Sequence, residues 1–255
     1  MNRKNKCSKI SRFLLLIICG ICMCLECWPM VRNESMAAYL FVYFMNNSPE
    51  GEQLYFAVSR DGYNYIPLND GKRIVNLDDI ARWKCIRDPH ILRGHDRKTF
   101  YMVATDMKSS VGWSSNDGIV LCKSIDLINW RITAVDFPTE FPHLYTRDDL
   151  KRVWAPQTIY DEKEKKYMVY YSLQNKDDYL TIYYSYANSD FTVLSEPKKM
   201  VDYGSSIIDA DIVKHDNLYH MFLAGIWKVT APDLKGPWSP LDKNKKYQLK
   251  KWSKY

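Results

Sequence analysis

Cysteine is scarce beyond the first 36 residues of this 255-residue chain. Only Cys85 and Cys122 follow that segment, so the remainder can form at most one disulfide and no cysteine framework holds its fold. The same part of the chain has no HExxH motif, no cluster of Cys and His, and no glycine-rich phosphate loop. The residues therefore indicate neither a catalytic metal nor a nucleotide cofactor.

Positive charge is also sparse in the body of the chain. The formal net charge is +6, but residues 1–36 hold six Lys or Arg against two Glu, which leaves the rest nearly neutral. Binding to nucleic acid requires a concentrated basic face, so no nucleic-acid partner is expected. The exception is a basic tail at residues 243–255, which we expect to be a solvated end.

No hydrophobic run reaches the length of about 20 residues that predicts a membrane-spanning helix. Residues 1–36 begin with a basic stretch followed by an apolar stretch at residues 13–25, which is the pattern of an export signal. We therefore expect a leader over residues 1–36. The mature chain would be periplasmic, at the cell surface or extracellular, with no stable membrane span. A lipoprotein anchor at Cys19 is the alternative.

Aromatic residues are plentiful, with nineteen Tyr, nine Phe and eight Trp against ten Gly. Aromatic side chains suit the half-buried surface of a pleated sheet. One aromatic, strand-like segment recurs at residues 38–44, 100–106, 167–172 and 219–225. The last three copies each follow an apolar segment and a polar turn, which is the pattern of a β-hairpin.

A turn signature closes each repeat, in which an Asp precedes an aromatic or apolar residue by a few positions. The four acids are Asp61, Asp126, Asp190 and Asp233, and such side chains accept hydrogen bonds from nearby backbone amides. Repeats of a few short strands match the blades of a β-propeller. The sequence thus predicts an all-β propeller over residues 37–242 with about four blades and almost no helix.

The repeats also predict roles for residues between the strands. Trp130 and Trp238 occupy the same outer position in their repeats and are expected in the core. The linker at residues 136–149 is rich in Pro and charge, and we expect it to lie over one face. Arg87 is expected to form an ion pair between blades.

Two acids lie at the start of innermost strands in this arrangement. Asp88 opens the segment "DPHI" and Asp209 opens "DADIV". The first strand of each blade lines the central channel, so we expect the two carboxylates to converge at its mouth, where each perturbs the pKa of the other. Pro89 is expected to hold Asp88 in an extended conformation at a stiff strand entrance.

Five motifs in order, "RDPHI", "YMVATD", "KSIDLINW", "VWAPQTIYDEKEKKYMVYYS" and "IDADIVKHDNLYHMF", resemble glycoside hydrolase family 43. The similarity covers roughly residues 38–240. It implies a five-bladed β-propeller, here incomplete because the chain stops about one blade short. It also implies inverting hydrolysis, without a cofactor, of oligosaccharides or polysaccharides that contain arabinose, xylose or galactose.

The resemblance assigns roles to individual acids. Asp88 corresponds to the general base that activates water, and Asp209 to the acid that tunes the general acid and orients substrate. Asp211 is the competitor of Asp209, and only one of the two is expected to face the channel. The family's general-acid Glu has no counterpart, because no Glu follows Glu196. We therefore expect impaired hydrolysis; the alternatives are a carbohydrate-binding pseudoenzyme and an unstable fragment.

Three further residues are predicted to bind substrate. His90 lies two residues after Asp88 and is expected to share its face and reach a sugar hydroxyl. Trp154 is expected either to stack on a sugar ring or to pack between blades. Gln157 stands where many family members carry an acid, and it either binds a hydroxyl or caps a blade strand.

Overall fold

The computed structural model describes residues 38–77, 81–114 and 116–242. The predicted leader at residues 1–36 and the basic tail at residues 243–255 lie outside the described residues. The part of the chain from Tyr39 onward forms one unit. Within the described ranges, no helix is long and apolar enough to cross a membrane.

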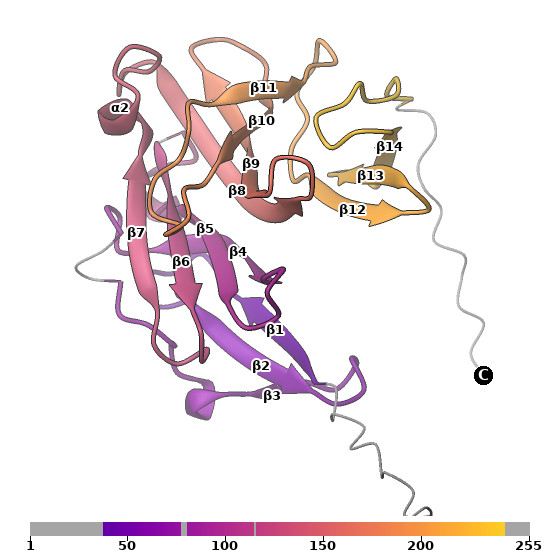
Figure 1. The fold of residues 1–255 in the computed structure, drawn as a ribbon. Coiled ribbons are helices and arrows are strands. Elements are labelled where there is room, and N and C mark those ends of the chain that lie inside the picture. The colour runs from indigo at the N-terminus through magenta and orange to yellow at the C-terminus, as the bar shows by residue number, and fades with distance from the viewer. Residues whose placement is uncertain (1–37, 78–80, 115, 243–255) are drawn as a thin grey trace, which may run out of the picture. The chain divides into compact units, whose positions relative to one another are not determined.

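The described residues form four antiparallel sheets (Figure 1), which we call blades 1 to 4 in chain order. Blade 1 contains β1 (Tyr39–Tyr43), β2 (Tyr55–Ser59) and β3 (Ile66–Pro67). Blade 2 contains β4 (Ile86–Arg93), β5 (Phe100–Asp106), β6 (Gly118–Ser124) and β7 (Arg131–Asp136). Blade 3 contains β8 (Leu150–Asp161), β9 (Lys166–Asn175), β10 (Thr181–Tyr186) and β11 (Lys198–Val201). Blade 4 contains β12 (Asp211–His215), β13 (Leu218–Leu223) and β14 (Trp227–Ala231).

Helical structure is limited to short segments in the described part of the chain. They are η1 (Asn69–Gly71), η2 (Ser109–Val111) and α2 (Phe137–Glu140). In every blade the strands are neighbours in chain order, so each blade is a simple meander. The all-β fold with about four propeller-like blades is confirmed, as are the three predicted hairpins β4–β5, β8–β9 and β12–β13.

Each pair of successive blades encloses a hydrophobic cluster. The alternation of side chains along a strand explains how one blade serves two clusters. In β9, Met168 and Tyr170 belong to the cluster shared with blade 4, whereas Val169 and Tyr171 belong to the cluster shared with blade 2. All four are at most 1% exposed. A central strand is therefore apolar on both faces, which accounts for the uninterrupted aromatic runs in the sequence.

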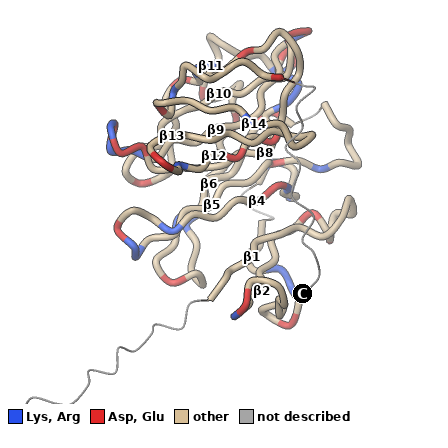
Figure 2. The backbone as a smooth tube through the Cα atoms, turned by 90° about the vertical axis from the view of Figure 1, so that its right-hand side faces the viewer, with Lys and Arg blue, Asp and Glu red and all other residues tan. Residues whose placement is uncertain are grey.

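Charged residues gather in the turns at the strand ends, while most strand positions carry none (Figure 2). Two turn acids fulfil their predicted role: Asp61 and Asp126 each accept hydrogen bonds from the amides two and three residues further on. Asp233 accepts one such bond. In blade 3 the acceptor is Asn188, which bonds the amides four and five residues further on. Asp190 lies in this turn as predicted, but the side chain that accepts the amide bonds is that of Asn188.

The linker at residues 136–149 does more than cover a face. It contains α2, and its aromatic residues Phe137, Phe141 and Tyr145 are buried in the cluster between blades 2 and 3. The Phe137 ring meets the Tyr171 ring edge-on at 5.2 Å. The sequence analysis did not anticipate this core role, because the proline and charge of the segment stand beside three residues with large apolar side chains that pack between the two blades.

Other predicted packing residues are confirmed. Trp130 is partly buried against the cluster between blades 1 and 2, and Trp238 is partly buried against the cluster between blades 3 and 4. Arg87 on β4 pairs with Glu52, which precedes β2, at 2.9 Å, and the Glu52 side chain is fully buried. This ion pair links blades 1 and 2. Cys85 and Cys122 are both buried and unpaired.

Removing the Phe137 ring tests the role of the linker as core. Because Phe137 is fully buried, Phe137→Ala is expected to lower the free energy of unfolding by about 3–5 kcal/mol, measured by urea denaturation. Tyr63→Ala removes a ring that is 83% exposed and is the matched control, with an expected change of about 0.5 kcal/mol or less. Equal effects of the two substitutions would contradict a core role for the linker.

Candidate active site

The first strands of blades 2, 3 and 4 share an unusual backbone step. Asp88, Ala155 and Asp209 have φ angles of 49°, 46° and 57°, in the left-handed region that residues with a side chain rarely adopt. In β4 and β8 the pairing with the next strand shifts at this step. Asp209 lies two residues before β12. Such strained positions persist only where surrounding contacts hold them.

The prediction that Pro89 keeps Asp88 extended is wrong. Pro89 has no N–H to donate to β5, and β4 bulges between Arg87 and His90. Asp88 turns into the left-handed region inside this bulge. The intrinsic preference of a residue before proline is thus overridden within this bulge, where the Asp88 side chain accepts a hydrogen bond from Thr105 on the next strand of the same blade.

Buried hydroxyl groups hold this step. Thr105 on β5 is fully buried, and its Oγ1 accepts a hydrogen bond from the Ala155 amide at 2.9 Å. Ser172 on β9 accepts one from the Asp209 amide at 3.2 Å. Each hydroxyl belongs to the second strand of one blade and holds the left-handed residue of the following blade. The same link therefore occurs twice, once between blades 2 and 3 and once between blades 3 and 4.

Thr105 also orients the proposed base. Its hydroxyl donates to Asp88 Oδ2 at 3.2 Å while accepting from the Ala155 amide. A hydroxyl has one proton and two lone pairs, so both contacts are satisfied together. Thr105 thereby couples the orientation of the Asp88 carboxylate to the position of blade 3.

His90 lies in a second layer of contacts between blades. Its Nδ1 accepts a hydrogen bond from the Thr158 amide on β8 at 3.2 Å, so the proton of the neutral ring is on Nε2. Burial lowers the pKa of His90 to about 4, which keeps the ring neutral near pH 7. The predicted contact with a sugar hydroxyl stays a prediction, and only Nε2 is left to make it.

Gln157 occupies the equivalent layer between blades 3 and 4. Its Oε1 accepts a hydrogen bond from the Tyr170 hydroxyl at 2.9 Å, and that hydroxyl accepts from the Ile212 amide at 3.0 Å. This network matches the polar-cap interpretation of Gln157. Its binding to a sugar stays a prediction.

Trp154 packs against one aromatic ring and one guanidinium group. Its ring lies edge-on to Trp113 at 6.2 Å, and the Arg152 guanidinium lies 4.9 Å from its centroid. Arg87 lies 5.1 Å from the Trp113 ring. These contacts match the packing interpretation of Trp154, and stacking on a sugar remains a prediction.

The two predicted acids interact across the blades. Burial raises the pKa of Asp88, while the adjacent Arg87 and the Thr105 hydrogen bond oppose that rise. Burial also raises the pKa of Asp209, and the negative charge of Asp88 raises it further. Burial alone raises the pKa of Asp211. Of the two acids in "DAD", Asp209 is therefore the one whose pKa the charge of Asp88 affects.

The sequence analysis missed Thr105, Ser172 and Tyr170 as residues of this site. A signal for two of them exists, because Thr105 and Ser172 both occupy the sixth position of the recurring aromatic strand. A hydroxyl at the same place in two otherwise apolar repeats indicates a shared contact. Among the described residues, no group of three or more His, Cys, Asp or Glu is placed to hold a metal ion.

Replacing the Thr105 hydroxyl tests the link. Thr105→Val keeps the shape of the side chain but leaves the buried Ala155 amide without its acceptor, so the free energy of unfolding is expected to fall by about 1–3 kcal/mol. The pKa of Asp88, followed by NMR, is expected to rise further because a bond to its charged form is lost. Thr133→Val on β7 is the control. Unchanged stability and an unchanged Asp88 pKa would show that the hydroxyl does not hold the step.

Comparison with known proteins identifies the family of the chain. The sequence profile of a family described as a probable glycosyl hydrolase domain, related to glycoside hydrolase family 43, matches residues 34–252. An α-L-arabinofuranosidase from Bifidobacterium longum subsp. longum is 27% identical over 208 residues. The match covers 72% of this chain and 19% of the arabinofuranosidase.

Solved structures of similar fold include two exo-β-1,3-galactanases. The enzyme from Clostridium thermocellum has a TM-score of 0.60 at 12% identity, covering 80% of this chain and 45% of that chain. The enzyme from Phanerochaete chrysosporium, solved with β-1,3-galactotriose, has a TM-score of 0.58 at 13% identity, covering 80% and 47%. The chain thus spans under half of these structures and about a fifth of the arabinofuranosidase. Since the family profile covers most of its length, the chain belongs to the glycosyl hydrolases of the family 43 group.

Proposed function

We propose that the space around Asp88 and Asp209 binds a sugar, with Asp88 as the general base of inverting hydrolysis. The observation that carries this proposal is that the negative charge of the half-buried Asp88 raises the pKa of the exposed Asp209. Both residues also have a left-handed backbone, Asp88 within the first strand of blade 2 and Asp209 two residues before the first strand of blade 4. In an inverting enzyme the base activates a water that attacks the anomeric carbon. Asp209 then positions the substrate and adds a negative charge next to the reacting sugar.

The surroundings of Asp88 suit a base. Burial raises its pKa, and a carboxylate with a raised pKa is a better proton acceptor once it is ionised. Thr105 bonds Oδ2 and so directs Oδ1 toward the attacking water. The proton passes from that water to Asp88 as the new bond to the anomeric carbon forms.

The leaving group receives less help in this proposal. The sequence has no Glu after Glu196 that could serve as the general acid. Among the described residues, the only charged group that raises the pKa of Asp209 is Asp88, which is the proposed base and not an acid. General acid catalysis contributes roughly 10²–10⁴-fold. We infer that hydrolysis by this chain is impaired and favours substrates whose leaving group departs without a proton.

The relatives suggest the sugars to try first. One is an α-L-arabinofuranosidase, and two similar structures are exo-β-1,3-galactanases. We therefore propose arabinofuranosides and β-1,3-linked galactosides as candidate substrates, with xylosides as a third class.

A second candidate function is sugar binding without turnover. The missing Glu favours it, because a site with a base but no acid can still hold a sugar through its polar and aromatic residues. The idea of an unstable fragment is less well supported, since three buried clusters join the successive blades. A cooperative thermal transition of the purified chain would exclude it.

We further propose that the chain is exported. The support is the basic start followed by the apolar stretch at residues 13–25. A glycan-directed protein outside the cytoplasm would meet polysaccharides directly.

Leaving-group dependence separates the two candidate functions. We expect the purified chain to hydrolyse 2,4-dinitrophenyl arabinofuranoside or galactoside, and to act at least about 100-fold more slowly on the corresponding disaccharide, as loss of a general acid requires. Asp88→Asn is expected to abolish turnover. Asp216→Asn, at an acid whose side chain is 85% exposed, is the matched control and should leave turnover unchanged.

Each other outcome has a definite meaning. Turnover that survives Asp88→Asn would overturn the assignment of the base. Fast hydrolysis of unactivated disaccharides would overturn the proposed impairment. Binding of the sugar by calorimetry with no turnover of any activated glycoside would establish the second function instead.

A further inference from the structure

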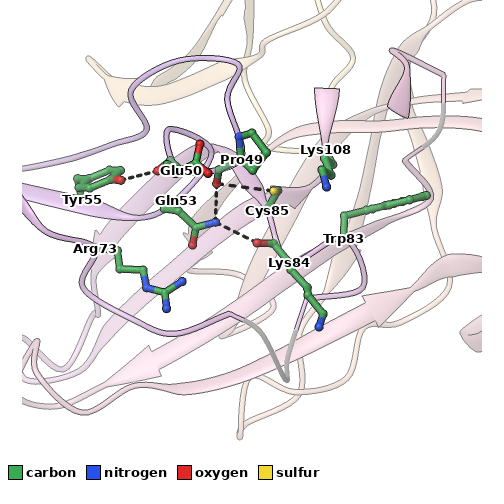
Figure 3. A pocket seen from close by; sticks show the side chains of 9 residues that line it. All are labelled: Pro49, Glu50, Gln53, Tyr55, Arg73, Trp83, Lys84, Cys85 and Lys108. Atoms are coloured by element: carbon green, nitrogen blue, oxygen red, sulfur yellow. Dashed lines mark hydrogen bonds between the residues drawn. The ribbon is translucent and has the colours of Figure 1, made fainter. Parts of the chain in front are cut away.

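A pocket of about 390 Å³ is formed by residues outside the candidate active site (Figure 3). It lies among the segment before β2, the chain after η1 and the residues before β4, and neither Asp88 nor Asp209 lines it. Its volume falls within the range of sites for small ligands. The proposed hydrolysis does not use this pocket.

The charged side chains around the pocket are mostly cations. Arg73, Lys84 and Lys108 line it, against one carboxylate, Glu50. Figure 3 shows the Arg73 guanidinium and the Lys108 amine on opposite sides of Gln53. A ligand that carries a negative charge is therefore complementary to the pocket.

Gln53 supplies a buried acceptor at the centre of the pocket (Figure 3). Its Nε2 donates to the backbone oxygens of Pro49 and Lys84 at 2.9 and 3.0 Å, so the amide cannot be turned around without losing both bonds. Its Oε1 is buried and has no hydrogen-bond partner, and the residue is only 6% exposed. A buried acceptor in this state costs free energy and would be satisfied by a hydroxyl donor.

Aromatic rings line the pocket and continue out of it. Tyr55, which lines the pocket, stacks with Tyr43 on β1 at 5.6 Å. Tyr43 in turn stacks with Phe41 at 5.3 Å and an interplanar angle of 9°. Phe41 is 50% exposed. We call Tyr55, Tyr43 and Phe41 the aromatic strip.

The strip lies on the face of blade 1 that points away from blade 2. The alternate residues Leu40 and Val42 pack against the cluster between those blades, so Phe41 and Tyr43 face the other way. The strip leads from a cationic pocket to an open surface. A ligand that fits both parts has one charged end and an extended, neutral remainder with faces that pack on aromatic rings.

We propose that the pocket and the aromatic strip bind an acidic oligosaccharide. A uronate carboxylate lies among Arg73, Lys84 and Lys108, and one of its hydroxyls donates to Gln53 Oε1. The following neutral sugars pack on the rings of Tyr43 and Phe41. This site holds a glycan on the protein whether or not Asp88 hydrolyses it.

The test compares glucuronosyl-xylotriose, a tetrasaccharide with one uronate at its end, with neutral xylotetraose by calorimetry and NMR. We expect the acidic ligand to bind more tightly, with an affinity that falls as salt rises. Lys84→Gln with Lys108→Gln should weaken it by about tenfold or more, since two charge-assisted contacts are lost. Lys198→Gln, at an exposed lysine on β11, is the control.

Two further variants separate this site from the others. Asp88→Asn should leave the affinity for glucuronosyl-xylotriose unchanged, so failure of the proposed hydrolysis leaves this inference intact. Phe41→Ala should weaken binding of the tetramer but not of the monomeric uronate. Equal binding of neutral and acidic ligands, no binding of either, or loss of binding in Asp88→Asn alone would overturn the proposal.

Discussion

Hydrogen bonds that backbone amides donate to buried hydroxyls of the preceding blade determine the geometry of the candidate site. Thr105 holds the Ala155 amide and Ser172 holds the Asp209 amide. The residues at these left-handed steps each cost on the order of 1–3 kcal/mol, and the surrounding contacts must offset that cost. Asp209 is held by such a bond to its amide, whereas Asp88 is held through its side chain by the same Thr105 hydroxyl that accepts from Ala155.

Ionisation of the two acids also lowers the free energy of unfolding. Burial raises the pKa of both Asp88 and Asp209, so the folded chain binds protons more tightly than the unfolded chain does. The stability associated with these groups is greatest at low pH and is lost as the pH rises through their folded pKa values. At neutral pH the ionised acids oppose folding, and the hydrophobic clusters between the blades must compensate.

Much of the fold follows from local rules, whereas the details of the site depend on neighbouring blades. The recurring aromatic strand predicts the hairpins, and the position of "DPHI" and "DADIV" in the repeats predicts that Asp88 and Asp209 converge. The conformation of Asp88 escapes prediction because the preference imposed by Pro89 is local, whereas the bulge in β4 arises from its pairing with β5. The same reason applies to His90, whose partner on β8 is remote in sequence.

The central claim is that Asp88 and Asp209 lie close enough for one charge to act on the other. The most direct measurement is an NMR titration of the aspartate carboxyls in the unaltered chain and in Asp88→Asn. The account predicts that the pKa of Asp209 falls in the variant, because a negative charge that raises it has been removed, while the pKa of Asp211 stays the same. An unchanged Asp209 pKa would contradict the account.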